Sequence, residues 1–383
     1  MYSKTKIPAI LGFLAAATLL AQDAPLAKSS VNINLPPDSP VVLLKSNDSS
    51  RTTARGAAVL VDVDIALTLR NTSTSRIHGI TLRVVAQEVA PAGVGSVFQP
   101  GLNVGPGEAF PVHIATKLMR PATMQGTPAI QVNLDGVLFQ DLSFYGEDRL
   151  HSKRVMTVAE LEAQRDRTAL KRLLADGGQE RLRQGVLKIL ARQHSLPQVQ
   201  GTVRAAGITN AAVAAITPPE HQEKFAFLQF PDSPVELRQG STLIAGSEAR
   251  APSVEVYNRS DKPVKYVELG WVLTDPAGQS YMAGSLPSTD PAFTVAPKSA
   301  GTIRQDRTMA FSTNGKPLPI GKVTSFVSQV EFADGRVWIP NRENLDSKPL
   351  LTQVLEPSAE EARLAYLYAT KGLPALVDEL KKY

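Results

Sequence analysis

The sequence VLVDVDIALTLR, residues 59–70, alternates apolar and polar side chains more clearly than any other segment of the chain. Val59, Val61, Val63, Ile65, Leu67 and Leu69 are the apolar members of this alternation. A period of two places alternate side chains on opposite faces of a strand. The residues Asn71-Thr72-Ser73-Thr74-Ser75 follow, and their composition is typical of a turn. The stretch therefore predicts a strand with one face in a core.

Further short strands surround this segment. Ile80, Leu82, Val84 and Ala86 alternate in the same way, and residues 129–134 alternate up to Asp135-Gly136. Because Asp-Gly strongly favours a tight hairpin, we expect a turn at that dipeptide. Short strands with frequent turns and no helices between them predict an antiparallel β-sandwich over residues 41–150.

The same pattern occurs a second time, which predicts a second β-sandwich over residues 223–347. The strand residues Leu67 to Ala86 match Val254 to Leu273 at an offset of 187 positions. Val104-Gly105-Pro106 matches Val295-Ala296-Pro297 at 191, and Asp135-Gly136 matches Asp334-Gly335 at 199. The strand before the second Asp-Gly fits 198, so one extra loop residue is expected there.

Each predicted sandwich is followed by helical sequence. Thr157 to Glu160 and Ser358 to Glu361 both have the form of a capping box, and Gly177-Gly178 is typical of a helix end. We expect a helical pair over residues 155–192 and a C-terminal helical segment over 356–383. Residues 23–40 and 193–222, rich in proline, glycine and small residues, are expected to be a flexible lead-in and a linker.

The N-terminus has the form of a secretory signal peptide over residues 1–22. Lys4 and Lys6 precede an apolar run from Ile7 to Leu20, which is too short to span a bilayer, and Ala21 offers a cleavage site. We expect a periplasmic or secreted protein after cleavage near Ala21, with no transmembrane segment in the mature chain. The alternative is a buried helix of the folded protein.

Composition excludes several chemistries. The chain has no cysteine, so disulfides, thiol nucleophiles and cysteine-based zinc sites are absent. Its formal charge of +5 becomes +3 without the two signal lysines, which makes nucleic acid an improbable partner. The five histidines show no metal-ligand spacing, and no nucleophile-elbow or phosphate-loop motif occurs. We therefore expect no enzyme activity, no cofactor and no metal.

Two features point to a binding surface. Segment 146–192 holds eleven Lys and Arg against seven Asp and Glu, and it could meet an acidic partner or an anionic surface. Its candidate contact residues are Arg165, Arg167, Lys171 and Arg172, although a solvated helix face with internal ion pairs is the simpler interpretation. Tyr257 and Tyr266 fall on the opposite parity from the apolar residues, so they are the aromatic candidates for exposure. Trp271 matches core-facing Val84 and is expected to be buried.

The stretch Val254 to Pro297 resembles the small immunoglobulin-like domains of bacterial envelope proteins, of the FxLYD or fibronectin type III kind. It shares a strand, the Asn-x-Ser turn, a valine-rich strand, Asp275-Pro276-Ala277-Gly278 and Val295-Ala296-Pro297. The resemblance implies mainly β architecture, two tandem antiparallel immunoglobulin-like β-sandwiches each followed by a short helical pair, and an accessory, non-catalytic role. We expect a binding or structural module of the cell envelope that interacts with an unknown envelope protein. The alternatives are a carbohydrate- or peptidoglycan-binding accessory protein, and an enzyme with an unrecognised site.

Overall fold

The computed structural model describes residues 30–87, 91–121, 129–197, 199–205, 219–288, 290 and 292–383. The expected signal peptide lies outside the described residues. The chain divides into two compact units, each described here by itself. Unit 1 comprises Met1–Thr72, Leu82–Val97 and Gly107–Leu134, and unit 2 comprises Ser73–Thr81, Phe98–Pro106 and Asp135–Tyr383.

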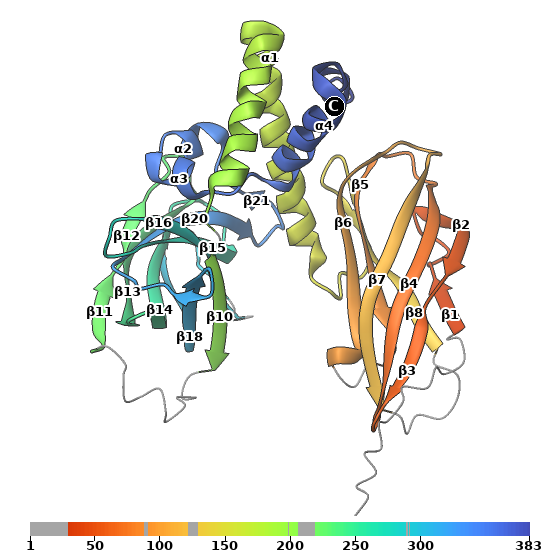
Figure 1. Cartoon of the computed structure of the whole chain (residues 1–383), viewed down its shortest axis with the longest axis horizontal. Helices are drawn as coiled ribbons and strands as arrows, with labels where there is room; N and C mark the ends of the chain where they lie inside the picture. Colours follow the sequence, from red (N-terminus) through yellow and green to blue (C-terminus); the bar gives the residue numbers. More distant parts are fainter. Residues whose placement is uncertain are drawn as a thin grey trace, which may run out of the picture. The chain divides into compact units, whose positions relative to one another are not determined.

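The N-terminal half of the chain is built from strands, as the alternating sequence predicts (Figure 1). They form one sheet in the order β1-β8-β5-β6, with β9 on β8, and another in the order β2-β4-β3, with β7 on β4. The strands are β1 (Ser30–Asn34), β2 (Val41–Asp48), β3 (Arg51–Arg55), β4 (Ala58–Asn71), β5 (Ile77–Val85), β6 (Val94–Val104), β7 (Ala109–Pro121), β8 (Ala129–Phe139) and β9 (Phe144–Tyr145). The alternating segment lies in β4, where its apolar side chains are buried.

The C-terminal half contains a second set of strands. One sheet has the order β12-β20-β15-β16, with β21 on β20; the other has the order β10-β18-β14-β13-β11, with β17 on β14 and β19 on β18. The strands are β10 (Val199–Ala205), β11 (His221–Lys224), β12 (Ala226–Leu228), β13 (Val235–Ala245), β14 (Glu248–Asn258), β15 (Val264–Thr274), β16 (Ser280–Pro287), β17 (Ala300–Arg304), β18 (Arg307–Thr313), β19 (Lys316–Pro317), β20 (Lys322–Phe332) and β21 (Val337–Trp338).

The two halves repeat one strand order. β1 pairs in parallel with β8, and β12 pairs in parallel with β20. The pairs β2–β4, β4–β7, β13–β14 and β15–β20 are antiparallel. Asn71 and Asn258, 187 positions apart, both end the central strand of their sheet and are fully buried. The Asn258 amide donates to the carbonyls of Lys262 and Val295, at 2.8 and 3.0 Å. The same polar residue is thus buried at the same strand end in both halves.

The repeat differs from the sequence expectation at one turn. Asp135-Gly136 lies inside β8, and Asp135 is buried, where it accepts from the Leu150 N–H at 3.3 Å. The hairpin turn follows at residues 139–143, in which Leu142 has φ 66°, just as Gly335 has φ 82° in the turn after β20. The expected offsets of 199 and 198 are therefore wrong, because these two positions correspond at 193. Local dipeptide preference was overridden by burial of the aspartate.

Helices follow the strands of each half. They are α1 (Ser152–Ser195), α2 (Arg342–Asp346), α3 (Pro349–Val354) and α4 (Ala359–Leu380). The predicted capping box at Ser358 is present, since its hydroxyl accepts from the Glu361 N–H at 3.1 Å. The one predicted at Thr157 is wrong: α1 has already begun, and the Thr157 hydroxyl donates to the Lys153 carbonyl at 2.8 Å.

Two segments expected to be irregular contain strands. β1 lies within the lead-in 23–40, and β10 and the first half of β11 lie within the linker 193–222. β10 pairs with β18 along its whole length. Glycine- and proline-rich composition did not prevent pairing because each segment adds to the edge of an existing sheet. Residues 206–218 of the linker lie outside the described residues.

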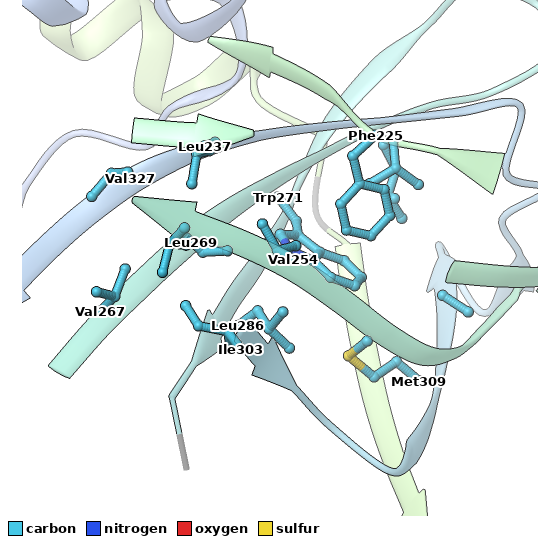
Figure 2. Packing of buried hydrophobic residues seen from close by; sticks show 14 of the residues in the cluster. Phe225, Leu237, Val254, Val267, Leu269, Trp271, Leu286, Ile303, Met309 and Val327 are labelled. Atoms are coloured by element: carbon cyan, nitrogen blue, oxygen red, sulfur yellow. The ribbon is translucent and has the colours of Figure 1, made fainter. Parts of the chain in front are cut away.

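The core of the second set of strands surrounds Trp271, which is 2% exposed, as predicted from its match with Val84. Figure 2 shows Trp271 among Phe225, Val254 and Leu269, and its ring meets that of Phe225 edge to face at a centroid distance of 5.3 Å. This packing fixes the sheets that carry the helices. In the part of the chain that the structure describes, no helix is both long and apolar enough to cross a membrane.

Candidate functional site

α1 is a helical hairpin rather than one straight helix. Gly177 and Gly178 have non-helical backbone angles, and Gly178, with φ 65° and ψ −162°, lies in a region that only glycine adopts readily. The two segments then run back along each other. A Cβ at Gly185 would lie 2.5 Å from Cδ1 of Leu173, so glycine permits the close approach of the second segment to the first.

α4 is bent in the same way at Gly372, which has φ 80° and is followed by Pro374. Its apolar side packs on that of α1. The shared cluster consists of the buried side chains Leu170, Leu182, Val186, Ile189, Leu364, Ala365, Leu376 and Leu380. Leu170 and Ile189 of this apolar cluster, and Leu173 packed against it, also line a groove along α1, as does Glu361 of α4, so the cluster and the groove share residues.

This groove has a volume of about 1270 Å³ and is here called the α1 groove. The two segments of α1 form its walls, and residues 339–346, which include α2, close one side. Leu161, Ala169, Leu173 and Gly185 are half-buried and give it an apolar floor. All of these residues belong to unit 2. The groove thus offers apolar contact along a helical hairpin.

Two buried carboxylates and three arginines form one end of the α1 groove. Arg165 makes a two-pronged contact with Asp166, at 2.9 and 3.1 Å. Arg342 and Arg192 bind the two oxygens of Glu361, at 2.6 and 2.7 Å. Asp166 and Glu361 are almost completely buried, so these ion pairs are held in a low-dielectric setting. They fix the guanidinium groups in position, with much of their hydrogen-bonding capacity already used.

A cavity of about 160 Å³ adjoins this end, between the arginines and the apolar residues Met282, Phe326, Leu351 and Leu355. Glu162 also lines it, and burial raises the pKa of its carboxyl, an effect that nearby Arg165 partly opposes. No hydrogen bond or ion pair of Glu162 occurs with another described residue. Glu162 is therefore the one carboxyl of this end that lacks a direct partner among the described residues.

The rim of the α1 groove carries both ion-paired and unpaired cations. Arg172 pairs with Glu343, both of them exposed. Arg181 and Lys188 are also exposed, and among the described residues neither has an ion pair or hydrogen bond. Asp176 is the corresponding unpaired anion on the rim. Two unpaired cations on the second segment of α1 thus leave a local positive charge beside an apolar floor.

The structure separates the four basic residues that the sequence singled out. Arg165 and Arg172 line the α1 groove, whereas Lys171 is half-buried and lies outside its lining. Arg167 is 4% exposed. Its guanidinium binds Glu160 and Glu360, at 2.7 and 3.3 Å, and stacks on the Tyr383 ring at 4.0 Å. The prediction that Arg167 meets a partner is wrong, because it is buried in an internal ion-pair network.

The two tyrosines lie away from the α1 groove. Tyr266 is only 8% exposed, its hydroxyl donates to Glu268 at 2.7 Å, and the Arg154 guanidinium lies 3.5 Å from the ring centre. Burial raises the pKa of this tyrosine. The expected exposure of Tyr266 is wrong: it lies on the face of β15 opposite to core residue Val267, as its parity predicts, but Arg154 of α1 packs on that face and buries it. Tyr257 is half-buried under the Arg238 guanidinium at 3.8 Å.

His113 and Asp64 form a second polar feature, in unit 1. Their side chains meet at 2.7 Å in a depression of about 640 Å³ that Asp62 and Lys117 also line. Both are more than half exposed. In water a histidine–carboxylate pair receives little of the activation that a buried site provides. No group of three or more His, Asp and Glu side chains suited to a metal ion occurs among the described residues.

Sequence reasoning missed the residues that close the α1 groove. Ile339 to Asp346 and Glu361 are more than 140 positions from the α1 segments that they face, and no local pattern links them. Arg181 and Lys188 were visible only as members of a basic segment. A comparison with protein-family models finds no match to this chain, and a comparison with curated proteins finds none either.

Proposed function

We propose that this protein is a non-catalytic binding module whose α1 groove holds a helical segment of a partner protein. The observation that carries the proposal is the combination of an apolar floor with two unpaired rim cations, Arg181 and Lys188. An amphipathic helix that lays its apolar face in such a groove is a common mode of recognition. The rigid hairpin favours this mode because its groove exists before the partner binds.

The dimensions of the α1 groove support a helical occupant. Its first wall runs from Leu161 to Asp176, which corresponds to about 22 Å at 1.5 Å per residue. A partner helix of about four turns has that length. Its apolar side chains, three and four residues apart, would contact Leu161, Ala169 and Leu173.

Charge supports an acidic partner helix. Carboxylates one or two turns apart on its flank would meet Arg181 and Lys188, which lie on one side of the second α1 segment. The cations at the other end already have partners, since Asp166 and Glu361 occupy Arg165, Arg192 and Arg342. The proposal therefore assigns charge recognition to the rim and leaves the buried ion pairs a structural role.

The proposal also includes where the module acts and which fold family it belongs to. The basic, apolar and small residues of 1–22 support export to the periplasm or beyond the cell, where the partner would be an envelope protein. The repeated strand order supports two tandem immunoglobulin-like β-sandwiches that arose by duplication. Such sandwiches commonly serve as scaffolds for binding surfaces.

Charge reversal tests the proposal. The full-length protein and its Arg181→Glu/Lys188→Glu variant would each be used to capture proteins from extracts of the native host, with quantification by mass spectrometry. We expect at least one acidic protein to lose tenfold or more of its recovery. The matched control is Arg307→Glu/Lys316→Glu, an equal charge change at exposed residues outside the groove. Equal recovery with both double variants would reject the assignment of the rim.

A further inference from the structure

The two halves of the chain allow one edge strand to be compared with its own counterpart. β2 and β13 occupy the same place, each antiparallel to the central strand of its sheet. Leu43 of β2 faces Leu69, and Leu237 of β13 faces Val256. Leu69 and Val256 are both fully buried, so Leu43 and Leu237 lie on the core side of their sheets.

The two leucines differ in exposure. Leu237 is 3% exposed, whereas Leu43 is 36% exposed, and its neighbours Val42 and Leu44 are exposed by 40% and 43%. Three consecutive exposed apolar residues place apolar surface on both faces of β2. The core of unit 1 is thus open at an edge where the core of unit 2 is closed.

The main chains of β2 and β13 have the same outward-facing groups. Thr72 N–H donates to the Pro40 carbonyl, and Arg259 N–H donates to the Pro234 carbonyl, both at 2.8 Å. Bonding alternates along an antiparallel pair, so the N–H and C=O of Leu43 and Leu237, three residues further on, point away from the central strand. Each of these residues therefore has an outward donor and acceptor at the sheet edge.

Unit 2 satisfies the outward groups of Leu237, whereas no described residue of unit 1 bonds those of Leu43. The Gln229 amide donates to the Leu237 carbonyl at 2.6 Å and accepts from its N–H at 3.4 Å. In unit 1 the position that corresponds to Gln229 is occupied by Leu35, which has no polar side chain. The preceding cap is shared: Ser39 binds both outward groups of Val41, and Ser233 binds both of Val235. Unit 1 thus has a serine cap like that of unit 2, but it has Leu35 where unit 2 has the glutamine cap.

Unit 2 also covers its edge with a strand. β11 runs antiparallel to β13, with Lys224 opposite Ser241. Phe225 and Phe227 follow, close enough that a Cβ at Gly240 would lie 2.8 and 3.1 Å from their rings. Among the described residues of unit 1, no strand other than β4 pairs with β2.

We propose that the β2 edge of unit 1 receives an extended segment of a partner protein, which adds antiparallel to β2. Its main chain would bond the outward N–H and C=O of Leu43, and its apolar side chains would cover Leu43 and the exposed leucine beside it. The neighbouring Lys45 has no described ion-pair partner, so an acidic residue suits the segment at that end. This is strand addition, in which main-chain bonds supply affinity and alternate side chains supply specificity.

The probe is a synthetic peptide with the sequence of residues 221–230, HQEKFAFLQF. In unit 2 its first four residues pair with β13, and its second glutamine caps Leu237. Fluorescence anisotropy of the labelled peptide with full-length protein should show saturable binding in the micromolar range. Leu43→Lys, which removes the apolar contact, should weaken binding at least tenfold. Leu43→Pro removes the outward N–H, which an edge strand tolerates, and replaces the leucine side chain by a smaller apolar ring without adding charge; it should weaken binding similarly.

The matched control is Leu243→Lys, a leucine 39% exposed on β13, which should leave peptide binding unchanged. Circular dichroism would verify that both Leu43 variants keep their strand content. Absence of saturable binding, or equal binding by the Leu43 variants, would overturn the proposal. Light scattering that shows a dimer, dissociated by Leu43→Lys, would also overturn it and assign the edge to a second copy of this chain.

Discussion

Leu43 and Leu237 occupy the same position in a repeated sheet, opposite the buried residues Leu69 and Val256, yet one is 36% exposed and the other 3%. The difference follows from their surroundings, because Gln229 caps the edge beside Leu237 and β11 covers β13 further along, at residues 241–244. The repeated strand order thus has one covered edge and, among the described residues, one open edge. The open edge and the α1 groove are the two surfaces on which the proposed interactions rest.

The two leucines should respond differently to truncation. Leu237→Ala removes a buried side chain and should lower the free energy of unfolding by about 2–5 kcal/mol. Leu43→Ala should lower it by less than about 1 kcal/mol, because a third of its surface already meets water. Urea denaturation followed by circular dichroism measures both, and tryptophan fluorescence adds a report on unit 2, which holds Trp271 and Trp338. Equal losses would contradict the open edge.

Removal of the Arg167 guanidinium should be costly. Arg167→Met leaves the Glu160 carboxylate, which is 1% exposed, without its closest cation, and Glu360 retains Arg363 at 2.7 Å. We expect a loss of about 3 kcal/mol in the free energy of unfolding at neutral pH, the low end of the range for a broken buried pair. The control is Arg183→Met, whose partner Glu180 is exposed and which should change stability little. Chemical denaturation compares the two.

The bend in α1 should depend on Gly178. Its backbone conformation is costly for any residue with a Cβ, so Gly178→Ala should destabilise the protein by about 1–3 kcal/mol. The neighbouring exposed change Gln179→Ala should be close to neutral. Thermal unfolding measured at 222 nm separates the outcomes. A neutral Gly178→Ala would mean that the two segments can join without this conformation.

Glu162 should make stability depend on pH. Burial raises the pKa of its carboxyl in the folded protein above the unfolded value. Between those two values the folded state binds more protons than the unfolded state, so this group lowers stability as pH rises. Glu162→Gln removes the effect and should stabilise the protein at pH 7 but much less at pH 4. Urea denaturation at both pH values measures this, and a gain independent of pH would contradict it.

The strands of the fold were predictable where a strict alternation coincides with burial, as in Val59 to Leu69 and again around Trp271. Prediction failed where a tertiary contact replaced the local rule. Asp135 is buried in β8 instead of turning a hairpin, and Tyr266 is buried because Arg154 of α1 packs on its ring. In each case the residue that determines the position of the side chain lies outside the segment from which the prediction was made.

The candidate site was predictable only in part. Arg165 and Arg172 were recognised from the basic segment and do line the α1 groove, but Arg167, from the same segment, is buried. Composition cannot distinguish a cation that pairs with a distant carboxylate, such as Glu360, from one that remains unpaired. That distinction depends on the packing of α4 against α1.

The most direct test of the α1 groove as a binding site is photo-crosslinking from within it. A benzoylphenylalanine at Leu173, on the groove floor, would be compared with one at Leu187, which is 41% exposed on the same hairpin but outside the groove. In cells of the native host, illumination should give a discrete adduct from position 173, absent from position 187 and lost with Arg181→Glu/Lys188→Glu. Identical adducts from both positions, or no adduct from position 173, would contradict the account.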